Sequence, residues 1–140
     1  MIRLAYIAVL LAAWVQRAEA RTDVTAAVTA HLLARGASAV SEVSRTFLVE
    51  GQSTALPVRL ERAGCAGYLA LGLGEVRDVD LALYTKAGQL VAEDVAIAPY
   101  AYARVCGEAG TELYASATLY AGRGQLSLLR VDDAPRELGR

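Results

Sequence analysis

Residues 79–85 have the sequence VDLALYT, in which apolar and polar side chains alternate. Successive side chains of a β-strand point to opposite faces, so Val79, Leu81 and Leu83 share one face of this segment. The same alternation occurs in LPVRL at residues 56–60. Strands with one apolar face are typical of an antiparallel sheet that buries one side.

From Arg45 onward, such segments recur at short intervals and are separated by glycine- and proline-containing turns. The pattern predicts eight strands, at residues 46–50, 55–61, 67–73, 79–85, 90–95, 100–107, 112–120 and 125–131. Pro57 lacks an amide donor, which predicts that its strand lies at a sheet edge or carries a bulge. Eight short strands are too few for a wide barrel, whereas two stacked sheets would bury their apolar faces. We predict an all-β sandwich over residues 45–132, followed by a tail at 133–140.

The first residues have the features of a secretory signal. Arg3 precedes the apolar run LAYIAVLLAAWV, and small residues stand at Ala18 and Ala20, as signal peptidase requires. An uncleaved membrane anchor is the alternative, but the run is shorter than the roughly 20 residues that a membrane-spanning helix needs. We therefore expect a signal peptide at residues 1–20, export to the periplasm or the extracellular medium, and no membrane span after cleavage.

Residues 21–44 are predicted to form a separate N-terminal segment with a short helix. Thr22 and Asp23 can cap the helix, residues 22–35 are rich in Ala, Leu and Arg, and Gly36 ends the run. His31 is the single histidine of the chain. We interpret it as a helical surface residue rather than a metal ligand or a base.

Cys65 and Cys106 are the only cysteines. In an oxidising compartment such a pair persists as a disulfide, and closing a loop of about 40 residues would destabilise the unfolded chain by about 4 kcal/mol. The alternatives, a reactive thiol pair or a metal site, would favour a C-x-x-C spacing or several histidines, which the chain lacks. We expect the bond to clamp the inner surfaces of the two sheets together.

Charge argues against nucleic acid as a partner. The chain has 14 Lys and Arg against 15 Asp and Glu. Removing residues 1–20 takes away Arg3, Arg17 and Glu19, which leaves a net charge of −2. Nucleic-acid binding needs clustered basic side chains that displace counterions from phosphates, so we exclude DNA and RNA.

Asp78 and Asp80 form a D-x-D pair at the head of one predicted strand, with Glu75 nearby. Calcium binds several hard oxygen ligands, and two carboxylates could begin such a shell. The alternative is that Asp80 accepts backbone hydrogen bonds and stabilises the adjacent turn. Calcium is the only cofactor that the sequence suggests, and no other metal site is predicted.

Six tyrosines follow residue 20, and an aromatic ring with a polar tip suits a contact with protein or glycan. We predict that Tyr68, Tyr84 and Tyr114 pack in the core or at its rim. Tyr100 and Tyr102, in the segment APYAY, are the predicted partner surface.

A catalytic site would need a nucleophile, a base and a group that orients the base. The single imidazole lies outside the predicted sandwich, so we predict that the chain is not an enzyme. The alternative is a small secreted hydrolase or inhibitor that uses the acidic side chains Asp78, Asp80 and Asp94, since two carboxylates can suffice for glycoside hydrolysis.

The region from about residue 46 to 131 resembles the bacterial pre-peptidase C-terminal domain and its relatives among secreted proteins. The resemblance consists of short motifs spaced along the predicted strands. The matching positions are Gly64 with Tyr68, Asp80-Leu81 with Leu83-Tyr84 and Gly88, Gly110 with Tyr114, and Gly122 with Gly124. The cysteine pair is not a general feature of that family, and Ser116 and Thr118 stand where aliphatic residues are usual.

This resemblance implies a jelly-roll-like sandwich without chemistry of its own, of a kind usually appended to secreted peptidases. Together with the signal and the absence of a catalytic constellation in the sequence, it predicts an exported, non-catalytic module with a binding or structural accessory role. A protein or glycan partner is expected.

Overall fold

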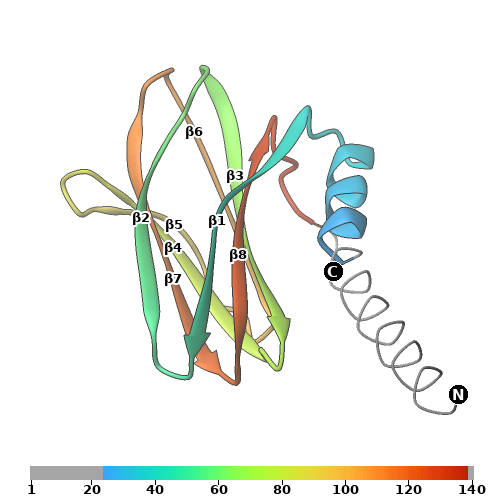
Figure 1. Ribbon diagram of the computed structural model, residues 1–140. Coiled ribbons are helices and arrows are strands. Elements are labelled where there is room, and N and C mark those ends of the chain that lie inside the picture. Colours follow the sequence, from blue (N-terminus) through green and yellow to red (C-terminus); the bar gives the residue numbers. More distant parts are fainter. Residues whose placement is uncertain (1–23, 139–140) are drawn as a thin grey trace, which may run out of the picture. The chain divides into compact units, whose positions relative to one another are not determined.

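The computed structural model of the chain describes residues 24–138. Eight antiparallel strands form two four-stranded sheets that pack face to face (Figure 1). The strands are β1 (Ala39–Val49), β2 (Ser53–Arg59), β3 (Gly64–Gly74), β4 (Asp78–Thr85), β5 (Leu90–Asp94), β6 (Tyr100–Gly107), β7 (Glu112–Ala121) and β8 (Arg123–Asp132). Each of the eight predicted strands is confirmed.

Sheet A has the strand order β1-β8-β3-β6, and sheet B has the order β2-β7-β4-β5. Consecutive strands therefore alternate between the sheets for much of the chain, which is the connectivity of a jelly roll. The predicted jelly-roll-like fold is confirmed. Strand β2 lies at the edge of sheet B, as Pro57 predicted.

The core lies between the sheets and consists of the alternating apolar residues of both. Val79, Leu81 and Leu83 are completely buried, and they are opposite Leu119, Ala117 and Ala115 of β7, which are buried as well. Tyr68 is the largest fully buried side chain. The assignment of strand faces from the sequence is therefore confirmed.

Strand β1 begins at Ala39, whereas the sequence placed the first strand at 46–50 and the start of the sandwich at residue 45. The register of β1 against β8 shifts between Glu42 and Ser44, which makes Val43 the extra residue of a bulge. A bulge interrupts the period-two alternation of side chains. The alternating pattern on which the prediction relied therefore starts only after Ser44.

The disulfide joins Cys65 to Cys106, as predicted, but it does not clamp the two sheets. The two cysteines are directly opposite each other on β3 and β6, which are neighbours in sheet A. The expectation of a bond between the two sheets is wrong. The amino-acid sequence does not reveal which strands are neighbours in one sheet, so the location of the bond could not be predicted from it. The bond instead ties edge strand β6 to its neighbour.

Part of the outer face of sheet A is also buried, which the sequence did not predict. Leu69, Leu71, Leu129 and Val131 point away from the core, yet all are at most 8% exposed. The C-terminal tail lies along this face: the Ala134 amide donates to the Cys65 carbonyl at 3.2 Å. The cover is partial, because Phe47 of β1 also points away from the core and is 59% exposed.

Residues 24–34 are helical, within the predicted range of 22–35. The chain divides into two compact units, residues 1–31 and 32–140. The predicted signal peptide lies outside the described residues. No helix within residues 24–138 is long and apolar enough to cross a membrane.

Candidate binding site

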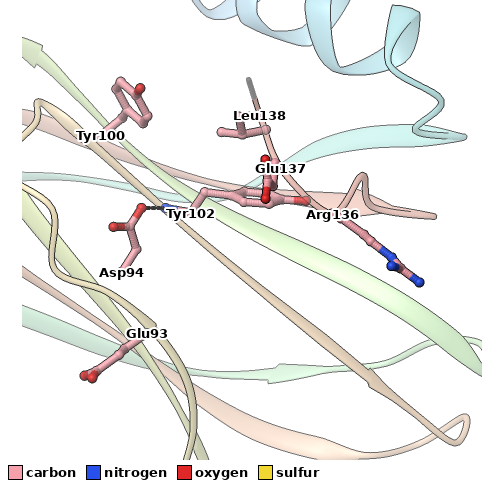
Figure 2. Close-up of a pocket in the computed structure, with 7 residues that line it drawn as sticks. All are labelled: Glu93, Asp94, Tyr100, Tyr102, Arg136, Glu137 and Leu138. Atoms are coloured by element: carbon pink, nitrogen blue, oxygen red, sulfur yellow. Dashed lines mark hydrogen bonds between the residues drawn. The ribbon is translucent and has the colours of Figure 1, made fainter. Parts of the chain in front are cut away.

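A hollow of about 550 Å³ lies beside β5 and β6, where the C-terminal tail passes (Figure 2). It includes both residues of the predicted partner surface, together with acidic residues of β5 and the end of the tail. The lining residues are Glu93, Asp94, Tyr100, Tyr102, Arg136, Glu137 and Leu138. Its volume is within the range typical of small-molecule sites.

Asp94 holds the β5 and β6 walls of the hollow together. One carboxylate oxygen accepts a hydrogen bond from the Ala96 amide at 3.1 Å, and the other accepts one from the Tyr102 amide at 3.0 Å (Figure 2). Because β5 belongs to sheet B and β6 to sheet A, this side chain bridges the two layers. Asp94 is thus engaged in positioning the walls.

Tyr102 forms a side of the hollow rather than a free binding group. Its hydroxyl donates a hydrogen bond of 2.7 Å to the Pro135 carbonyl, and burial raises the pKa of Tyr102 to about 12. The ring lies across Gly67 of β3, where a Cβ atom would stand 2.5 Å from the Tyr102 hydroxyl oxygen. The glycine therefore gives the ring its place on the sheet.

The tail is attached to β6 by a second hydrogen bond. The Arg104 guanidinium donates to the Ala134 carbonyl at 3.0 Å. Arg35, before β1, donates to the Glu137 carbonyl at 3.1 Å. These backbone contacts bring residues 136–138 to the rim of the hollow without using the side chains of Arg136 and Glu137.

Four polar side chains of the hollow have no hydrogen bond or ion pair with the described residues: Tyr100, Glu93, Arg136 and Glu137. Tyr100 is half-buried, and the other three are exposed. In Figure 2 the Glu93 and Arg136 side chains point away from the Tyr102 ring. The hollow thus offers one aromatic ring, two acceptors and one donor to a ligand.

Asp78 and Asp80 do not line this hollow. Both lie on the outer face of sheet B, because Val79 between them points into the core. Burial, and then the negative charges of Asp78, Asp94 and Glu93, raise the pKa of Asp80 above its ordinary value. Within residues 24–138 no group of three or more His, Cys, Asp or Glu side chains could hold a metal ion, and a calcium site here stays a prediction.

The structure corrects the placement of one tyrosine. Tyr68 is fully buried as predicted, but Tyr114 is 43% exposed and lies on the outer face of sheet B. Tyr84 lies opposite it on the same face and is half-buried. The signal was present in the sequence: each tyrosine follows a core leucine, Leu83 or Leu113, and so must point outward.

No family model and no curated protein matches this chain. It is similar in structure to a periplasmic inhibitor of g-type lysozyme from Aeromonas hydrophila, with 8% identity, 69% of this chain and 88% of the other covered, and a TM-score of 0.47. It is also similar to the C-terminal carbohydrate-binding module of a marine laminarinase from Zobellia galactanivorans, with 13% identity, 71% and 94% covered, and a TM-score of 0.43.

A third similar structure is a β-1,3-glucan-binding module from Bacillus halodurans, with 11% identity, 71% of this chain and 92% of the other covered, and a TM-score of 0.42. At such low identities the likeness concerns the fold alone.

Proposed function

We propose that this chain is an exported, non-catalytic binding module whose ligand is a glycan held in the hollow beside Tyr100. The observation that carries the proposal is that the lining combines an aromatic ring with polar side chains that have no partner among the described residues. Export rests on the predicted signal and on the disulfide, which persists in oxidising compartments.

The chemistry of the hollow suits a sugar. A sugar ring offers apolar C–H groups on its faces and hydroxyl groups at its edges. The Tyr100 ring could pack against such a face, since aromatic rings combine an apolar body with a polar tip. The carboxylates of Glu93 and Glu137 could accept hydroxyl hydrogen bonds, and the Arg136 guanidinium could donate them.

The structural roles of the remaining groups favour binding over catalysis. Asp94 uses both oxygens to bridge β5 and β6, and Tyr102 uses its hydroxyl to hold the tail. The alternative of an acid-dependent hydrolase would need Asp78 and Asp80 in a cleft, and neither lines the hollow. The resemblance to pre-peptidase C-terminal domains supports the further proposal of an accessory role beside a secreted enzyme.

The proposal is tested by calorimetric titration of the exported chain with a panel of soluble oligosaccharides. We expect at least one glycan to bind, and Tyr100→Ala to weaken binding about fivefold, since an aromatic contact contributes about 1 kcal/mol. Tyr120→Ala is the matched control, because this exposed tyrosine is not among the lining residues. Absence of binding across the panel, or equal affinity in the Tyr100 variant, would overturn the proposal.

A further inference from the structure

A band of large side chains crosses the outer face of sheet B from edge to edge. Pro57 of β2 is opposite Tyr114 of β7, Tyr114 is opposite Tyr84 of β4, and Tyr84 is opposite Leu90 of β5. Tyr114 and Leu90 are 43% and 49% exposed. The band therefore presents apolar surface to solvent across all four strands.

The next row of outward-facing side chains, parallel to the aromatic band, consists mostly of small residues and forms the low row of this face. It consists of Ala55, Ser116 and Ala82, which are opposite one another on β2, β7 and β4, and ends at Glu93 on β5. Small side chains beside a row of aromatic rings leave a shallow step along the sheet. An extended segment laid across the strands could rest against this step.

Beyond the low row the face is negatively charged. Asp78, Asp80 and Glu93 make no ion pair or hydrogen bond within residues 24–138, and one Asp78 carboxylate oxygen is buried without a partner. Repulsion by neighbouring carboxylates contributes to the raised pKa of Asp80. These three carboxylates therefore have no paired cation among the described residues.

Arg77 is the basic residue next to this acidic end: it immediately precedes Asp78, is exposed, and makes no ion pair with the described residues. Lys86, in the turn after β4, lies on the other side of the aromatic band from Asp80. Its ammonium group is already paired with Glu112 at 2.9 Å. Among the described residues, three carboxylates against the single Arg77 guanidinium leave this end with a net negative charge that a cation from outside could neutralise.

We infer that the outer face of sheet B is a docking surface for a basic segment of a partner protein. The partner's Lys or Arg side chains would approach Asp78, Asp80 and Glu93, and its apolar groups would pack on the band formed by Tyr84 and Tyr114. Charge complementarity selects this partner, because a neutral glycan would not neutralise the net negative charge of the acidic end. Aromatic residues are also enriched at protein interfaces.

This docking surface is a different site from the hollow beside Tyr100 that is proposed to bind a glycan. Glu93 borders both, so the variants that test the inference avoid it. The probe is a blocked peptide of alternating lysine and tyrosine, titrated into the exported chain by calorimetry and followed by amide chemical shifts. A peptide of alternating glutamate and tyrosine serves as the opposite-charge control, and neutral oligosaccharides form a third arm.

We expect the lysine peptide to bind, to shift the amides of β4 and β7, and to lose affinity as salt rises, because exposed charges are screened. Asp80→Asn and Tyr114→Ser should each weaken binding about fivefold or more, as loss of a charge or aromatic contact at an interface does. Glu108→Gln is the matched charge control, since Glu108 lies in the β6–β7 turn away from this face. Tyr100→Ala should leave peptide binding unchanged.

Peptide affinity that survives both Asp80→Asn and Tyr114→Ser would overturn the inference, as would equal binding of the glutamate peptide. Shifts at Tyr84 and Tyr114 caused by a neutral oligosaccharide, with none caused by the lysine peptide, would overturn it in favour of a second glycan surface. Thermal unfolding of each variant identifies loss of fold, and Tyr84→Ser then replaces a variant that fails to fold. Failure here leaves the Tyr100 test unaffected, because the two use different variants.

Discussion

The carboxyl group of Asp80 lies half-buried on the outer face of sheet B, with three other carboxylates close enough to repel it. Its folded-state pKa is therefore raised above the ordinary value of 3.8. For an acid with a raised pKa, ionisation favours the unfolded state. Asp80 thus costs no stability at pH values below 3.8, and the cost appears as pH rises through its folded-state pKa.

Asp80→Asn is expected to stabilise the protein at pH 7, by a few tenths of a kcal/mol, because repulsion between partly exposed charges is screened by solvent. At pH 3 the gain should vanish, since the carboxyl is protonated in both states. Urea unfolding at the two pH values measures the difference, with Glu108→Gln as the charge control. A loss of stability at pH 7 would contradict this assignment and would indicate that the Asp80 carboxylate has a stabilising partner.

Among the elements, the C-terminal tail has a structural effect out of proportion to its length. It is held to sheet A by hydrogen bonds from Tyr102, Arg104 and its own Ala134 amide, and it lies on the otherwise exposed outer face. It also supplies residues 136–138 to the hollow. Attachment of the tail and formation of the hollow are therefore coupled.

Tyr102→Phe should detach this tail in part and lower the free energy of unfolding by about 1 kcal/mol, because the variant removes one hydrogen bond while keeping the ring. Faster cleavage by trypsin at Arg136, or faster amide exchange at Ala134, would measure the detachment. Tyr100→Phe is the matched control, since the Tyr100 hydroxyl has no hydrogen bond to the described residues. Equal protease resistance in both variants would argue against the role of Tyr102.

For the whole molecule, the disulfide and the core stabilise different parts of the fold. The core between the sheets is formed by apolar residues of both, whereas the Cys65–Cys106 bond lies within sheet A and ties β6 to β3. Breaking the bond should therefore lower stability without separating the sheets.

Replacement of both cysteines by alanine is expected to lower the free energy of unfolding by about 2–4 kcal/mol, mainly because the unfolded chain regains conformational freedom. Circular dichroism of the variant should keep the β-sheet spectrum of the parent. Chemical denaturation measures the loss, and the parent protein under reducing conditions should reproduce it. Unchanged stability, or a variant without sheet structure, would contradict this separation of roles.

Much of the fold could be predicted because side-chain alternation is a local property. Val79, Leu81 and Leu83 identified a buried strand face from spacing alone, and Pro57 identified an edge strand through its missing amide. The start of β1 was missed because a bulge at Val43 breaks the alternation. Where a strand departs from regular geometry, the alternation of apolar and polar residues no longer identifies it.

The candidate site depended on pairings between distant segments. The sequence singled out Tyr100 and Tyr102, but it could not reveal that the tail around Arg136 would lie beside them or that Asp94 would bridge the two sheets.

Taken alone, the amino-acid sequence determined the strands, their buried faces, the cysteine pair and the two-layer class of fold, because each depends on residue type and short-range spacing. Only the tertiary structure decided that Cys65 and Cys106 share one sheet, that Tyr84 and Tyr114 stand side by side, and that the tail completes the hollow. Those relations depend on which strands become neighbours, and strand order is set by packing of the whole chain rather than by any local pattern.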